Sequence, residues 1–174
     1  MRTQLFIRAA APLLWLSCLM YSTTAATAEA DSEQQFGDWS KRCVAGDAPN
    51  SSACHIYQRV VVEGEGDNEK AVQLSLGYSP DESNPVAVIR MPLGLWLLNG
   101  ITLAVDDIPG QRFPVQVCAS AGCQTTLRLE PEMVDTLKNG QQLFITTYNV
   151  RREAVRVPLS LDGFAQALDT LQAN

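Results

Sequence analysis

The chain is short of positive charge. Of its 174 residues, 13 are lysine or arginine and 19 are acidic, which gives a formal net charge of −6. Nucleic-acid phosphates need Lys and Arg to replace their counterions, and anionic lipid attracts basic segments. We therefore predict that the protein binds no nucleic acid and does not attach to anionic lipid by charge.

A catalytic set is also missing. The only histidine is His55, so any Ser-His-Asp arrangement would have to use it. It lies in a run of strand-forming residues, where a lone histidine is an ordinary strand residue more often than a catalyst or a ligand. We predict no catalytic residues and no enzymatic activity, and we keep carboxylate chemistry at Asp106 and Asp107 as an alternative.

The apolar run at residues 9–21 is too short for an ordinary transmembrane span, which needs about 20 residues. Arg2 and Arg8 precede it, and the small residues that follow allow cleavage after Ala28 or Ala30. A short positive segment, an apolar stretch and a small-residue cleavage site are typical of a secretory signal.

We predict that residues 1–30 are a secretory signal peptide and that residues 31–174 form a single disulfide-stabilised β-rich domain. The mature chain would then have no transmembrane span. An uncleaved anchor is one alternative. A lipoprotein attached at Cys18 is another, although Trp15 occupies a position where the lipobox has leucine.

Removal of the signal leaves four cysteines, Cys43, Cys54, Cys118 and Cys123. An even number in an exported chain implies disulfides, with three connectivities. We choose Cys43–Cys54 and Cys118–Cys123, because short loops close readily. The chain-entropy relation gives about 3 and about 2 kcal/mol for the two loops. The absence of a C-x-x-C pair argues against a metal and against a redox-active dithiol, so we predict no metal or cofactor.

Alternating apolar and polar residues predict a mainly β domain with a packed core, since hydrophobic residues make up 46% of the chain. The expected fold is an antiparallel β-sandwich or a partly closed barrel. Two short helices are expected at 131–139, closed by Gly140 as a left-handed cap, and at C-terminal 161–172, with Ser160 as N-cap. Strands are expected at 36–43, 54–62, 71–78, 85–91, 101–105, 113–118, 124–129, 141–150 and 155–159, after a polar lead-in at 31–35.

The large apolar residues are interpreted first as core. Trp39 is expected inside, with its indole N–H on a backbone carbonyl, and a ligand platform is the alternative. The apolar run at residues 95–98 is also interpreted as core, because an exposed run of four invites aggregation. Asp106 and Asp107 read as turn residues. If the protein has a binding surface, we expect it at the loops around Trp96, Asp106 and Asp107.

Several pieces together resemble the invasion-associated locus B family of exported bacterial proteins, and they span essentially the whole mature chain. The apolar run before Gly100 departs from this pattern, because a more polar approach is expected there. The pieces are FGDW followed by a cysteine (residues 36–43), Cys54, MPLG followed by Gly100, the acidic turn at Asp106, the C-x₄-C pair Cys118 and Cys123, and SLDGFAQAL.

The resemblance implies a protein of the periplasm or outer cell envelope, or a secreted one, with no established enzymatic activity. In pathogens the family is linked to host-cell invasion. We expect a non-catalytic protein that binds another protein or an envelope component. The alternative is a small-molecule or lipid-binding β-barrel module, with a pocket lined by residues such as Trp96, Phe113 and Tyr148.

Overall fold

The computed structural model describes residues 33–45, 52–63, 69–79 and 83–172. The strands form two antiparallel sheets of seven and four strands. The larger sheet has the order β1 (Glu33–Phe36), β2 (Trp39–Ala45), β3 (Ser52–Glu63), β4 (Lys70–Gly77), β5 (Val86–Met91), β9 (Gly122–Arg128) and β8 (Val117–Ala119). The smaller sheet has the order β11 (Ala154–Ser160), β10 (Gln142–Tyr148), β6 (Ile101–Val105) and β7 (Gln111–Phe113).

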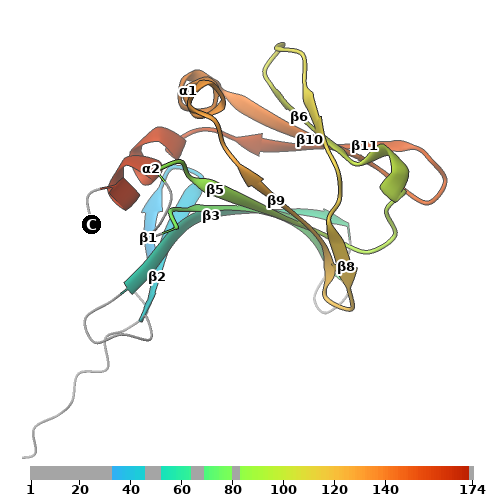
Figure 1. The fold of residues 1–174 in the computed structure, drawn as a ribbon, viewed down its shortest axis with the longest axis horizontal. Helices are drawn as coiled ribbons and strands as arrows, with labels where there is room; N and C mark the ends of the chain where they lie inside the picture. The colour runs from blue at the N-terminus through green and yellow to red at the C-terminus, as the bar shows by residue number, and fades with distance from the viewer. Residues whose placement is uncertain (1–32, 46–51, 64–68, 80–82, 173–174) are drawn as a thin grey trace, which may run out of the picture. The chain divides into compact units, whose positions relative to one another are not determined.

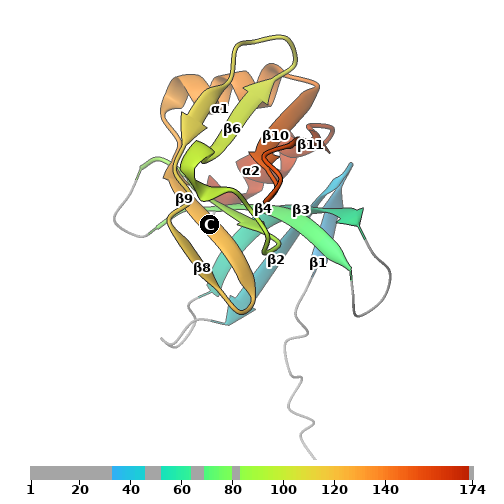
Figure 2. The same cartoon turned by 90° about the vertical axis from the view of Figure 1, so that its right-hand side faces the viewer.

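The two sheets share one apolar core. Alternate residues of the central strands are buried, such as Val72, Leu74 and Leu76 in β4 and Leu143 and Ile145 in β10, as period-two alternation requires. In Figure 1 the smaller sheet lies over the larger one, and Figure 2 shows the same two layers from the side. The mainly β class and the antiparallel sandwich are therefore confirmed, while no closed barrel forms in the described part of the chain.

The helices are α1 (Pro131–Asn139), α2 (Phe164–Gln172) and a 3₁₀ turn, η2 (Leu97–Asn99). The bounds of α1 are as predicted, but Gly140 is not a left-handed cap, since its φ is −81°. Glycine fits there for a different reason: a Cβ would lie 2.3 Å from Cγ1 of Val105.

The second helix starts later than predicted. Ser160 ends β11, and its hydroxyl accepts the backbone N–H of Asp162 at 3.1 Å, so it turns the chain instead of capping the helix. Gly163, at φ +81°, completes this turn, and α2 begins at Phe164.

Two predicted strands are interrupted. Gly37, at φ +53°, makes a tight turn inside 36–43, so Phe36 pairs with Trp39, and residues 33–35 of the expected lead-in belong to β1. The segment 113–118 crosses between sheets, because β7 ends at Phe113 in the smaller sheet and β8 belongs to the larger one. Pro114 lies at the crossing, where its missing N–H breaks no ladder.

The turn after β1 docks against the turn before α2. Trp39 is fully buried, and its indole N–H donates to the carbonyl of Ser160 at 2.9 Å. Its ring meets Phe164 edge-on with centroids 4.9 Å apart, and the Asp38 N–H donates to the carbonyl of Asp162 at 3.1 Å. The core interpretation of Trp39 is confirmed. The FGDW and LDGF motifs therefore form one structural contact.

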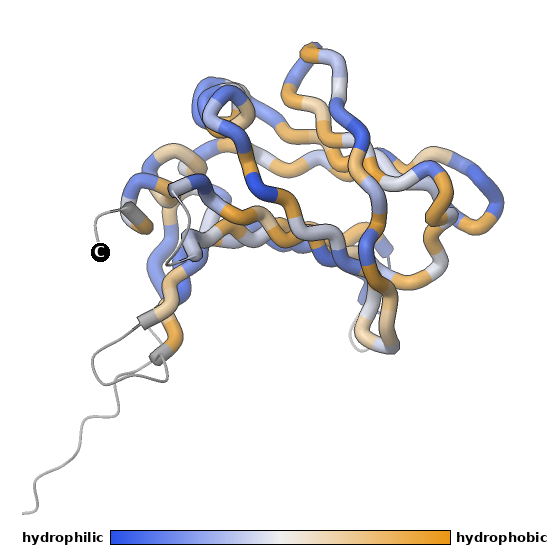
Figure 3. The backbone as a smooth tube through the Cα atoms, viewed as in Figure 1, coloured by the Kyte–Doolittle hydropathy of each residue, from blue (hydrophilic) through white to orange (hydrophobic). Residues whose placement is uncertain are grey.

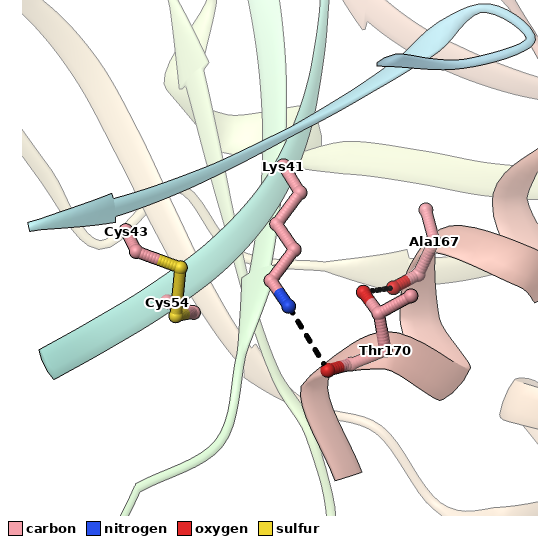
Figure 4. Close-up of a disulfide and its surroundings, with 5 residues drawn as sticks. All are labelled: Lys41, Cys43, Cys54, Ala167 and Thr170. Atoms are coloured by element: carbon pink, nitrogen blue, oxygen red, sulfur yellow. Dashed lines mark hydrogen bonds between the residues drawn. A yellow bond between two sulfur atoms is a disulfide. The ribbon is translucent and has the colours of Figure 1, made fainter. Parts of the chain in front are cut away.

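A lysine fastens the end of α2 to the larger sheet. Lys41 on β2 donates through Nζ to the carbonyl of Thr170 at 3.0 Å (Figure 4). A cation at the C-terminal end of a helix meets carbonyls that have no partner within the helix. Two residues further along β2, Cys43 is bonded to Cys54 of β3 (Figure 4).

Candidate functional site

The loop between β5 and β6 exposes apolar side chains. Leu93, Leu97 and Leu98 are 53%, 50% and 84% exposed, whereas Leu95 and Trp96 are half-buried. The core interpretation of the run 95–98 is therefore wrong for its last two leucines. The reason lies in the backbone, because residues 97–99 form η2, a 3₁₀ turn with no buried residue.

The β10–β11 turn lies beside this loop. Leu95 forms an isolated bridge with Asn149, and the N–H of Trp96 donates to the carbonyl of Tyr148 at 2.7 Å. The turn exposes Val150 by 67%. We call the exposed residues of these two loops the leucine-loop surface, and Figure 3 shows hydrophobic segments on both loops at this end. Its members are Leu93, Leu97, Leu98 and Val150.

Side-chain contacts stiffen the turn beneath this surface. The Asn149 Oδ1 accepts the backbone N–H groups of Arg151 at 2.9 Å and Glu153 at 3.0 Å. The Arg151 guanidinium pairs with the carboxylate of Glu153 at 3.1 Å. Arg152 lies over the Trp96 ring, with its Cζ 4.4 Å from the centroid. Tryptophan and arginine are enriched in protein interfaces, and this stacked pair adjoins the exposed Leu97.

Asp106 and Asp107 lie at the opposite end of β10. Trp96 bonds to Tyr148, the last residue of β10, while Asp106 bonds to Gln142, its first residue. At about 3.3 Å per strand residue the two ends are about 20 Å apart. The three residues expected at a binding surface therefore form no single site.

The carboxylate of Asp106 is occupied by the backbone. It accepts the N–H groups of Gln141 at 3.0 Å and Gln142 at 2.8 Å, and its φ of +50° suits a turn. Asp107 is exposed in the same turn. The turn interpretation of Asp106 is confirmed, and this geometry gives no acid/base pair.

The residues suggested for a barrel pocket are also separated. Trp96 lies by Tyr148 on β10, but Phe113 is on β7, on the far side of β6. The barrel that would enclose them does not form in the described segments.

The structure contains two disulfides, Cys43–Cys54 and Cys118–Cys123. Each joins residues directly opposite in neighbouring antiparallel strands, β2 with β3 and β8 with β9. Within the described residues no three His, Cys, Asp or Glu side chains are grouped to hold a metal ion. No described helix is long and apolar enough to span a membrane.

One hydrogen-bonded group on the larger sheet has shifted pKa values. The Tyr57 hydroxyl donates to Glu33 at 2.6 Å, and Arg42 pairs with the same carboxylate at 3.2 Å. These bonds, Tyr57 first, hold the pKa of Glu33 below its ordinary value. The bond to the carboxylate also raises the pKa of Tyr57. The group ties β1 to β3 across β2.

The sequence alone did not identify Leu98, Val150 and Arg152 as surface partners. The core interpretation of the run 95–98 includes Leu98. The juxtaposition depends on the β5–β6 loop reaching the end of β10, which is a long-range contact that no local pattern signals.

Comparison with known proteins gives a consistent assignment. The sequence profile of the Invasion associated locus B (IalB) protein family matches residues 39–172. Invasion protein B homologues of two Brucella abortus strains, 2308 and biovar 1 strain 9-941, are each 28% identical over 144 residues, covering 81% of this chain and 79% of theirs. The crystal structure of invasion associated protein B from Bartonella henselae shares the fold with a TM-score of 0.68 at 21% identity, over 82% of this chain and 95% of that one. On the profile match, which covers most of its length, the chain belongs to the invasion associated locus B family.

Proposed function

We propose that this is an exported, non-catalytic binding protein that holds a protein partner of the cell envelope through the leucine-loop surface. The observation that carries the proposal is the 84% exposure of Leu98 on a short, backbone-anchored turn. Exposed apolar groups gathered beside polar side chains mark protein-interaction sites. Binding would bury the exposed apolar side chains.

Export is supported by two observations of different kinds. The signal pattern at residues 1–30 lies outside the described residues and is a sequence argument. The two disulfides support an oxidising compartment, where such bonds persist. The periplasm, the outer cell envelope and the extracellular medium all fit, and a part in host-cell invasion belongs to the proposal only for a pathogen source.

A non-catalytic role is supported by the placement of the candidate groups. The Asp106 carboxylate binds backbone N–H groups. His55 has its ring beside Tyr57, with centroids 5.8 Å apart, on the larger sheet. Asp106 is bonded to the α1–β10 connection beside the smaller sheet.

The test is affinity capture from envelope extracts followed by titration of the captured partner. We expect the variant Leu97→Ser/Leu98→Ser to lose a protein that the wild type captures reproducibly, and to bind the purified partner at least tenfold more weakly. Ile108→Ser is the matched control, because Ile108 is 54% exposed near the opposite end of β10. Equal capture by the wild type and the double variant would refute the proposal.

Vesicle flotation separates the lipid alternative. If the wild type binds vesicles of envelope lipid, the double variant does not, and no protein is captured, the leucine-loop surface is a lipid-binding surface and a protein partner is excluded. If neither protein nor vesicles bind, the leucine-loop surface is not a binding site.

A further inference from the structure

The larger sheet has a second face, turned away from the shared core. Successive side chains of a strand point to opposite faces. The residues directly before and after the buried Ile56, Leu76 and Ile89 therefore point to this outer face. Figure 1 shows the sheet arched, with the C-terminal end of β2 and the tip of β8 turned away from the smaller sheet at its two edges. The outer face is therefore concave.

Polar side chains form a row across the middle of this face. The register places Gln73 of β4 opposite Arg90 of β5, and Arg90 opposite Gln124 of β9. Neighbouring strands are about 4.8 Å apart. The row thus presents an amide, a guanidinium and a second amide at regular spacing.

The next row carries hydroxyl groups that the amides orient. The Gln73 Nε2 donates to the Ser75 Oγ at 2.9 Å, and the Gln124 Nε2 donates to the Thr126 Oγ1 at 3.3 Å. Each hydroxyl oxygen is thereby an acceptor for an amide, so its own proton can be donated to a ligand. The same arrangement occurs on both sides of β5.

A hollow of about 530 Å³ opens in this face over β3, β4 and β5. Val88 lies in the hydroxyl row, between Ser75 and Thr126, and contributes an apolar wall to the hollow. Gln73, Ser75, Val88 and Arg90 are among the residues that line the hollow.

The hollow carries the positive charge of Arg90. Arg59, on the same face, pairs with Glu69, and Arg42 pairs with Glu33. Arg90 is exposed and forms no ion pair with any residue that the structure describes. A guanidinium fork matches a carboxylate in geometry and charge.

We propose that this hollow binds a hydroxylated carboxylate, either a uronic-acid unit of an acidic saccharide or a free sugar acid. Arg90 binds the carboxylate, the Gln73 amide and the Ser75 hydroxyl bind ligand hydroxyls, and Val88 packs on the ligand's C–H groups. The site is separate from the leucine-loop surface and does not depend on it.

Titration with defined probes tests this site. Trigalacturonate represents the acidic saccharide, gluconate represents the free sugar acid, and maltotriose is the uncharged control. We follow binding by calorimetry and by amide chemical shifts. We expect trigalacturonate or gluconate to bind and to shift amides of β4 and β5, and we expect maltotriose to bind at least tenfold more weakly.

Variants locate the binding to the row. Arg90→Ala should weaken acid binding at least tenfold, because a charge-assisted hydrogen bond is lost, and Arg90→Lys should recover only part of it. Arg112→Ala removes the same charge from β7 in the other sheet and should leave binding unchanged.

The outcomes separate the two ligand sources and the two proposals. Binding of trigalacturonate alone identifies a saccharide site, and binding of gluconate alone or of both identifies the sugar acid as sufficient. No binding of either acid, or equal binding by Arg90→Ala, overturns the inference. Leu97→Ser/Leu98→Ser should bind both acids as the wild type does, so failure at one surface is distinguishable from failure at the other.

Discussion

Among single residues, Asp106 has a structural role, because its carboxylate binds the backbone. Its carboxylate accepts two successive N–H groups at the start of β10, and its own N–H donates to the carbonyl of Gln142 at 2.9 Å. Asp107, one position along, has no such role in the described structure and is exposed. The two acids look equivalent in the sequence, but only the carboxylate of Asp106 accepts backbone hydrogen bonds in the described structure.

Asp106→Ala should therefore lower the free energy of unfolding by about 1–3 kcal/mol, because two N–H groups lose a charged acceptor. Urea denaturation followed by far-UV circular dichroism measures the change. Asp107→Ala serves as the control and should stay within about 0.5 kcal/mol of the wild type. Equal losses in the two variants would contradict the assignment.

At the scale of elements, the docking of the β1–β2 turn against the β11–α2 turn organises one end of the sandwich. Gly163 is confined there by position and conformation, since its φ is +81° and a Cβ would lie 2.0 Å from the carbonyl oxygen of Phe36. Gly94 has a similar φ of +94°, but a Cβ would meet nothing within 4 Å. A substitution at Gly94 therefore tests backbone strain alone, whereas one at Gly163 tests strain and close packing together.

Gly163→Ala should destabilise the protein by more than about 2 kcal/mol, because strain and a backbone clash add. Gly94→Ala should lower the free energy of unfolding by only about 1 kcal/mol, because an alanine at positive φ is strained. Thermal melts of both variants beside the wild type measure the difference. If the two melting temperatures fell together, the contact with Phe36 would not be a tight one.

Element predictions succeeded where the signal is local and failed where it is not. Alternation placed β4 and β5 nearly to the residue, and the bounds 131–139 were right for α1. The turn at Gly37 and the late start of α2 depend on contact between segments more than 120 residues apart, such as Trp39 with Ser160. The exposed turn of η2 failed for a related reason, because an apolar run is identical in sequence whether or not the fold covers it.

For the whole molecule, the division into sheets of seven and four strands could not be predicted from the sequence. β5 pairs with β9 and not with β6, its successor in the chain, so the chain leaves the larger sheet at Met91 and returns at Val117. Local alternation predicts that a strand exists but not its neighbour. The binding surfaces could not be predicted for the same reason, since the leucine-loop surface and the row through Arg90 are products of strand order.

Both disulfides lie in the larger sheet, one towards each edge, and the smaller sheet depends on the larger through the shared core. Loss of a disulfide should therefore lower the stability of the whole domain and not merely loosen a loop.

The variant Cys43→Ser/Cys54→Ser should lose about 3 kcal/mol of unfolding free energy, and Cys118→Ser/Cys123→Ser about 2 kcal/mol. The chain-entropy relation gives these values for separations of 11 and 5 residues. Urea unfolding by tryptophan fluorescence measures both. Reduced wild type is the control and should match the variant that lacks all four of these cysteines. Unchanged midpoints in both double variants would show that the bridges do not stabilise the fold.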